Sequence, residues 1–114
     1  MASVLVVETS ETVGTLLCDA VKEAGHRVEL VGTQREAEEL LSANLYDLVI
    51  SAMVLPDGSG LELAVKSADR GMSTMVTAAP PDALTITTIA GTTHLRKPYN
   101  VEEFRNLVAN QLGA

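Results

Sequence analysis

The chain contains no tryptophan, and its 114 residues include one phenylalanine, two tyrosines and one cysteine. With so few aromatic side chains, the core must consist mainly of valine, leucine, alanine and isoleucine. A single cysteine excludes an internal disulfide and fits a reducing compartment. No apolar run approaches the roughly 20 residues that a transmembrane helix needs, and the N-terminus has no basic segment of a signal peptide. We therefore expect a cytoplasmic protein.

Positive charge is also scarce. Eight Lys and Arg residues stand against 15 Asp and Glu residues, which gives a formal net charge of −7. A protein that binds nucleic acid or an anionic membrane through diffuse electrostatics needs the opposite sign, so neither is expected as a partner. The length fits one domain over residues 1–114, large enough to bury a core without disulfide or metal staples.

Apolar runs of strand length alternate with segments of helical periodicity along the chain. Strands are predicted at Val4–Val7, Arg27–Val31, Asp47–Met53, Ser73–Ala78 and Thr93–Arg96. Helices are predicted from the Ser10 cap to Gly25, from the Thr33 cap to Asn44, at Leu61–Ser67, at Asp82–Ala90 and after Asn100. Cys18 falls off the apolar stripe of the first helix, so we expect it to be partly exposed.

This alternation predicts an α/β fold, a doubly wound parallel sheet with right-handed crossovers. The flavodoxin-like strand order 2-1-3-4-5 suits five βα units and places a crevice between the first and third strands. Because the carboxyl ends of parallel strands meet at one edge, we expect Glu8, Ala52, Thr77 and Lys97 to lie together there.

Four segments, in this order and spacing, resemble the receiver domain of two-component response regulators. They are Val4-Leu5-Val6-Val7-Glu8, the stretch from Asp47 to Gly60, Met75-Val76-Thr77-Ala78 and Leu95-Arg96-Lys97-Pro98-Tyr99. The resemblance covers essentially the whole chain. It implies a role in two-component or phosphorelay signalling, with a histidine kinase or another regulator as the partner.

In that family an acidic pair after the first strand holds Mg²⁺, and an Asp at the end of the third strand accepts a phosphoryl group. Two further residues bind the phosphoryl group: a Thr or Ser that follows the fourth strand, and a Lys that follows the fifth strand and precedes a Pro. Thr77 and Lys97-Pro98 match this pattern, and the resemblance implies a cis peptide bond before Pro98.

Three positions depart from the family pattern. The acidic pair is reduced to Glu8-Thr9, the acceptor position holds Ala52, and the switch aromatic position holds His94. A methyl group cannot be phosphorylated, and one side-chain carboxylate is a poor Mg²⁺ site, so we expect no cofactor. The departures at three places favour a natural absence over a single engineered substitution. They indicate a pseudo-receiver, which is a phosphorylation-independent protein interaction module and not an enzyme.

Ser51 and Asp57 are the two nearby candidates for a replacement acceptor, and an ordinary structural role is favoured for each. Strand alternation points Ser51 to the face opposite Ala52, where a buried hydroxyl bonded to backbone is expected. Asp57 precedes Gly58, which is ordinary turn chemistry. Without an acceptor Asp, Lys97 is expected to form a structural ion pair with Glu8. His94 is either a pH sensor or a solvated side chain at a strand end.

Receivers also use the face of the fourth helix, fifth strand and fifth helix, so the resemblance implies a possible homodimer there. The alternative function is a small-ligand or nucleotide-binding flavodoxin-like protein or enzyme. Gly58-Ser59-Gly60 before a helix could then cradle a phosphate. That segment is not a Walker loop, and no Gly-rich loop follows the first strand. The interaction module is therefore the favoured interpretation.

Overall fold

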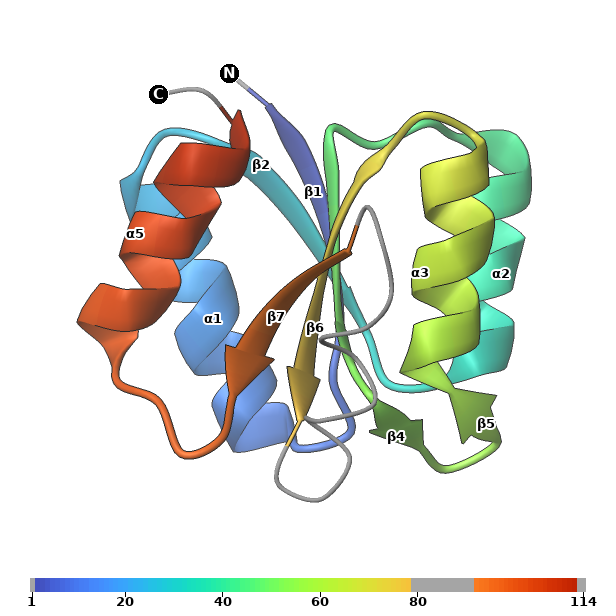
Figure 1. The fold of residues 1–114 in the computed structure, drawn as a ribbon, viewed down its shortest axis with the longest axis horizontal. Helices are drawn as coiled ribbons and strands as arrows, with labels where there is room; N and C mark the ends of the chain where they lie inside the picture. Colours follow the sequence, from blue (N-terminus) through green and yellow to red (C-terminus); the bar gives the residue numbers. More distant parts are fainter. Residues whose placement is uncertain (1, 79–91, 113–114) are drawn as a thin grey trace.

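A five-stranded parallel sheet forms the centre of the computed structural model, which describes residues 2–78 and 92–112. The strands follow the order β2-β1-β3-β6-β7 (Figure 1). Their bounds are β1 Ser3–Val7, β2 Arg27–Val31, β3 Leu48–Ala52, β6 Ser73–Ala78 and β7 Thr92–Arg96. When the five strands of this sheet alone are numbered in chain order, this is the predicted order 2-1-3-4-5. The predicted helix at 82–90 lies outside the described residues.

Among the described residues, two helices cover each face of the sheet. Helices α1 and α5 lie on one side and α2 and α3 on the other (Figure 1). Their bounds are α1 Glu11–Glu23, α2 Gln34–Ala43, α3 Gly60–Asp69 and α5 Val101–Leu112. Alternate residues of β1 pack into different layers, because successive side chains of a strand point to opposite faces. Val4 and Val6 join Phe104 of α5, whereas Leu5 and Val7 join Leu63 of α3.

The predicted helix caps are confirmed. The Ser10 hydroxyl accepts from the backbone N–H of Val13 at 3.3 Å, and the Thr33 hydroxyl accepts from that of Glu36 at 3.1 Å. The side chain of Asn100 accepts from the N–H of Glu103 at 2.8 Å. Each cap satisfies an N–H group that has no partner within its helix. No helix in the described part of the chain is long and apolar enough to cross a membrane.

The predicted exposure of Cys18 is wrong. Its side chain is buried and packs in the cluster that α1 and α5 form over the sheet. Burial raises the pKa of the thiol, partly offset by the charge of Lys22. A buried, protonated thiol is a poor nucleophile, so Cys18 is a packing residue.

The turn after β3 also differs from the prediction. The stretch from Pro56 to Gly60, which the sequence predicts as a turn, instead contributes to a small antiparallel hairpin of β4 Val54–Leu55 and β5 Gly58–Ser59. Helix α3 then begins at Gly60 and continues to Asp69, two residues beyond the predicted end. The hairpin connects the carboxyl end of β3 to the helix that covers it, so it borders the edge where the predicted site lies.

Candidate functional site

Ala52 and Thr77 lie side by side at the carboxyl end of the sheet. Ala52 is the last residue of β3, and its Cα is in register with that of Thr77 on β6. Residues in register on parallel neighbours share a face, so the methyl and hydroxyl groups are adjacent. The backbone N–H of Met53 donates to the carbonyl of Thr77 at 2.9 Å and fixes the two strand ends together. Both side chains are buried.

Glu8 and Lys97 form the ion pair that the sequence predicts. Glu8 follows β1, and its buried carboxylate lies 3.8 Å from the ammonium of Lys97 after β7. The other carboxylate oxygen accepts from the backbone N–H of Ser10 at 3.0 Å. Lys97 is 37% exposed at its side chain, and its peptide bond to Pro98 is cis, as the resemblance implied. The ion pair connects the end of β1, inside the sheet, to the end of β7, an edge strand of the sheet.

We expect Lys97→Met to lower the free energy of unfolding by about 1–2 kcal/mol, because it leaves the buried Glu8 carboxylate uncompensated. This value is discounted from that of a fully buried pair, since Lys97 is partly solvated. Glu8→Gln with Lys97→Met should cost less than Lys97→Met alone. Urea unfolding of the single and double variants measures this coupling, and strictly additive losses would contradict it.

Two buried hydroxyl groups at this edge have no hydrogen-bond partner in the described structure. They are Thr77 Oγ1 and Tyr99 Oη. Burial raises the pKa of Tyr99, and the charge of Glu8 raises it further. Tyr99 packs its ring against Phe104, with the centroids 6.4 Å apart. Tyr99 was not predicted as a site residue, although it directly follows the Lys97-Pro98 pair that marks the site.

The donor set at this edge does not fit Mg²⁺. Glu8 supplies the one carboxylate among the predicted site residues, and Lys97 and the Ser10 N–H already engage it. Thr9 is exposed beside it. The described residues contain no group of three or more His, Cys, Asp or Glu side chains placed to hold a metal ion. Mg²⁺ prefers several oxygen ligands, which this set does not supply.

His94 lies within β7, in register with Val76 on β6. Its side chain is outside the described residues, so its role as a pH sensor or a solvated group stays a prediction. The backbone position places it three residues before Lys97 on the same strand and connection.

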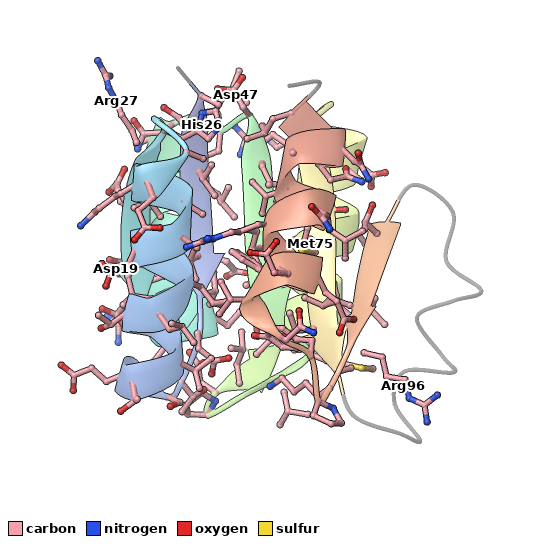
Figure 2. The ribbon with its side chains drawn as sticks, turned by 90° about the vertical axis from the view of Figure 1, so that its left-hand side faces the viewer. Asp19, His26, Arg27, Asp47, Met75 and Arg96 are labelled. Carbon is pink, nitrogen blue, oxygen red and sulfur yellow. The ribbon has the colours of Figure 1, made fainter. Side chains whose placement is uncertain are left out.

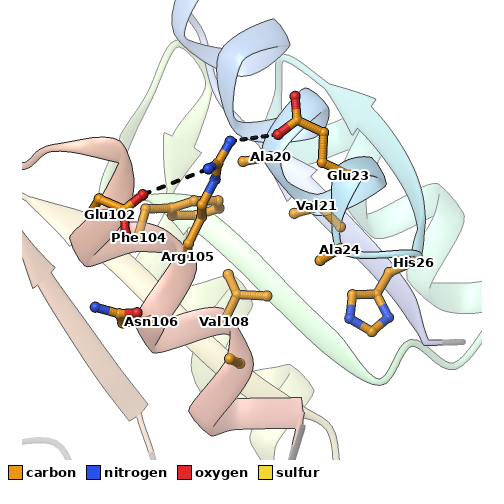
Figure 3. Close-up of a pocket in the computed structure, with 11 residues that line it drawn as sticks. Ala20, Val21, Glu23, Ala24, His26, Glu102, Phe104, Arg105, Asn106 and Val108 are labelled. Atoms are coloured by element: carbon orange, nitrogen blue, oxygen red, sulfur yellow. Dashed lines mark hydrogen bonds and ion pairs between the residues drawn. The ribbon is translucent and has the colours of Figure 1, made fainter.

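A separate groove of about 560 Å³ lies between α1 and α5 (Figure 3). Ala20, Val21 and Val108 line its floor. Arg105 of α5 bridges it through an ion pair of 2.5 Å to Glu23 of α1, and a second ion pair of 3.7 Å joins Arg105 to Glu102 of its own helix. The groove contains none of the predicted site residues, so the hollow and the receiver-like site are different places.

Comparison with known proteins decides the family. The profile of the response regulator receiver domain matches residues 4–109. The chain belongs to this family. All four predicted strand-end residues of the receiver site, Glu8, Ala52, Thr77 and Lys97, fall within the matched range.

Two similar curated proteins are transcriptional regulatory proteins. The chain is 30% identical to TcrA of Mycobacterium tuberculosis over 105 residues, which covers 88% of this chain and 42% of TcrA. It is also 30% identical to PhoP of Escherichia coli over 105 residues, covering 88% and 47%. The chain therefore spans less than half the length of either regulator.

Solved receiver domains share the fold. One from Clostridium thermocellum superposes with a TM-score of 0.87 at 20% identity, covering 99% of this chain and 95% of that one. The chemotaxis response regulator CheY4 of Vibrio cholerae gives 0.84 at 24% identity, covering 98% and 99%. The predicted flavodoxin-like α/β fold is confirmed.

The Ser51 hydroxyl is engaged within the protein. The residue is buried, and its hydroxyl donates to the carbonyl of Ala52 at 2.9 Å. It lies under the start of α3, because a Cβ added at Gly60 would stand 2.5 Å from its oxygen. The predicted buried hydroxyl bonded to backbone is confirmed.

Asp57 does more than the predicted turn chemistry. Its carboxylate accepts from the backbone N–H of Gln34 at 2.7 Å and from that of Arg35 at 2.9 Å. These are the first residues of α2, so Asp57 caps a helix that lies more than 20 residues away in sequence. The two hydrogen bonds lower the pKa of Asp57. Gln34 in turn accepts from the N–H of Ser59 at 3.0 Å and fixes the hairpin to α2.

Asp57→Asn should lower the melting temperature at pH 7, because the charge that the two N–H groups favour is lost. The folded state lowers the pKa of Asp57 below its ordinary value of 3.8. The stabilisation by the charged carboxylate is therefore fully present above pH 3.8 and is lost as the pH falls through the pKa of the folded state. The variant and the natural chain should therefore converge in stability when the pH is below the pKa of Asp57 in the folded state. Thermal unfolding at several pH values measures this.

The control is Asp19→Asn, which removes an exposed carboxylate of α1 (Figure 2). It should leave the melting temperature nearly unchanged at every pH. An equal effect of both substitutions would show that Asp57 acts only through the net charge.

The phosphate cradle of the alternative function finds no support in the glycine geometry. A Cβ at Gly60 would stand 1.8 Å from the carbonyl oxygen of Ala52, so glycine is needed for close backbone packing. The N–H of Gly60 already donates to the carbonyl of Met53 at 2.8 Å, and the Ser59 hydroxyl caps α3 through the N–H of Glu62 at 3.3 Å. Two N–H groups of the helix start are thus occupied by the protein itself.

Proposed function

We propose that this receiver domain is a pseudo-receiver that binds a protein partner in two-component signal transduction without being phosphorylated. The observation that carries the proposal is the buried methyl of Ala52 in register with Thr77. Phosphoryl transfer to a receiver needs a carboxylate nucleophile at that strand end. The hydroxyl of the neighbouring Ser51 is buried and donates to the backbone carbonyl of Ala52.

The charges at the site support a single fixed state. In a phosphorylated receiver the Lys ammonium balances the phosphoryl charge, whereas here Glu8 balances that of Lys97. No covalent event is then needed to hold Lys97 at the strand end. Recognition by the partner rests on the constant shape and charge of the domain.

The partner in this proposal is a histidine kinase or another regulator. A homodimer through the fourth-helix face would use β7 and α5, together with residues outside the described part. The formal net charge of −7 counts against nucleic acid and anionic membranes as partners of this domain. The proposal places the domain in the cytoplasm, as a signalling protein and not an enzyme.

Beryllium fluoride with Mg²⁺, a mimic of the phosphoryl group, tests phosphorylation independence by NMR. We expect no saturable shifts below millimolar Mg²⁺ at the amides of Glu8, Thr77 and Lys97. The chain with Thr9→Asp and Ala52→Asp is the matched control and should show such shifts. Saturable shifts in the natural chain would overturn the proposal.

A further inference from the structure

The outer edge of β2 has free backbone hydrogen-bonding groups. Within the described residues β2 pairs with β1 alone and ends the sheet. Arg27 N donates to Ala2 O at 2.8 Å, and Val31 O accepts from Glu8 N at 3.0 Å. Because backbone groups alternate in direction along a strand, those of Val28 and Leu30 point away from β1. Such an edge is a template for another strand.

The side chains along this edge carry opposite charges two residues apart. Arg27 and Glu29 are exposed and share one face of β2. Figure 2 shows Arg27 extending from the start of β2 into solvent. One carboxylate oxygen of Glu29 accepts from the Tyr46 hydroxyl at 2.9 Å, which leaves the other oxygen free for a second donor.

Apolar side chains flank the edge on both faces. Leu30 is 38% exposed, and it packs over Gly14 of α1, where an added Cβ would stand 2.8 Å from it. On the other side, Leu45 is 67% exposed and lines a hollow of about 370 Å³ with Arg27 and Glu29. Covering these side chains would add apolar burial to the backbone pairing.

We propose that two copies of this chain associate by antiparallel pairing of their β2 edges about a twofold axis at Val28. In this register Val28 of each copy exchanges N–H···O bonds with Val28 of the other. Arg27 of each copy then lies directly opposite Glu29 of the other. One self-complementary contact thus satisfies both charge pairs.

The charges select this register over its neighbour. Moving the axis by one residue to Glu29 would place the two Glu29 carboxylates against each other and Arg27 against Val31. Like charges directly opposite each other destabilise a strand pair. The short edge and the net charge of −7 on each copy oppose association, so the dimer is weak and forms at the protein concentrations used for NMR.

Charge reversal tests the pairing by sedimentation equilibrium of the whole chain. Arg27→Glu and Glu29→Arg should each raise the dimer dissociation constant about tenfold or more, because attraction becomes repulsion in both pairs. An equimolar mixture of the two variants should restore association, since every opposed pair then carries opposite charges. The matched controls are Arg35→Glu and Glu39→Arg, which make the same charge changes on α2.

Circular dichroism confirms that each variant is folded. A natural chain that stays monomeric would overturn the proposal, as would equal effects of Arg27→Glu and Arg35→Glu. A dimer that none of the four substitutions weakens would place the contact elsewhere, including the face of β7 and α5, and would also overturn it. The β2 contact does not depend on phosphorylation chemistry, so its failure leaves the pseudo-receiver proposal standing.

Discussion

The chain with Thr9→Asp and Ala52→Asp together should accept a phosphoryl group from acetyl phosphate in the presence of Mg²⁺. The two changes supply a carboxylate nucleophile beside Thr77 and a second acidic ligand beside Glu8. Under the pseudo-receiver proposal, these are the two parts of receiver chemistry that the chain lacks. Intact-mass spectrometry should show the addition of one phosphoryl group, whereas we expect none on the unsubstituted chain.

Three control variants separate the effect of the nucleophile from that of the second metal ligand. Thr9→Asp alone should stay unmodified because it has no nucleophile. Ala52→Asp alone should react slowly, since it has one acidic ligand for the metal. Thr9→Asp with Ala52→Asn should stay unmodified, because an amide is not a nucleophile for phosphate. A folded Thr9→Asp/Ala52→Asp chain that gains no phosphoryl group would show that the missing carboxylates are not what separates this domain from its relatives.

Gly60→Ala should be strongly destabilising. A Cβ at Gly60 would stand 1.8 Å from the carbonyl oxygen and 2.8 Å from the carbonyl carbon of Ala52. Both are backbone atoms of the central strand, so β3 or α3 must shift. We expect a loss of about 3 kcal/mol in the free energy of unfolding and a fall of roughly 10 °C or more in melting temperature.

Gly32→Ala is the control for this prediction. The nearest atom to a Cβ at Gly32 is the carbonyl oxygen of Glu8 at 3.8 Å, which is ordinary van der Waals contact. We expect this variant to keep its stability within about 1 kcal/mol. Equal effects of the two substitutions would show that the close approach of α3 to Ala52 does not limit packing at the site.

The arrangement of the sheet could be predicted because its strands have simple signals. All five residues of β3 are buried, and the sequence shows this as a continuous apolar run between polar segments. Since the carboxyl ends of parallel strands lie at one edge, the Glu8–Lys97 ion pair also followed. The strand order placed both residues at that edge, and the resemblance to receivers, with Ala52 at the acceptor position, left Glu8 as the expected counter-ion of Lys97.

The features that sequence reasoning missed depend on contacts between distant segments. The strands of the β4–β5 hairpin have two residues each, too few to show periodicity. The capping of α2 by Asp57 joins residues more than 20 positions apart. Cys18 lies at the border of the apolar stripe, and α5 is among the elements that form the cluster in which it is buried. No local pattern contains this information.

The most direct test of the account is the natural chain incubated with acetyl phosphate and Mg²⁺ and measured by intact-mass spectrometry. We predict the unmodified mass throughout, because Ala52 offers no oxygen for the phosphoryl group and Ser51 is buried with its hydroxyl donated to a carbonyl. A stoichiometric phosphoryl adduct, mapped to Asp57 or to any other side chain at the carboxyl edge of the sheet, would contradict the account.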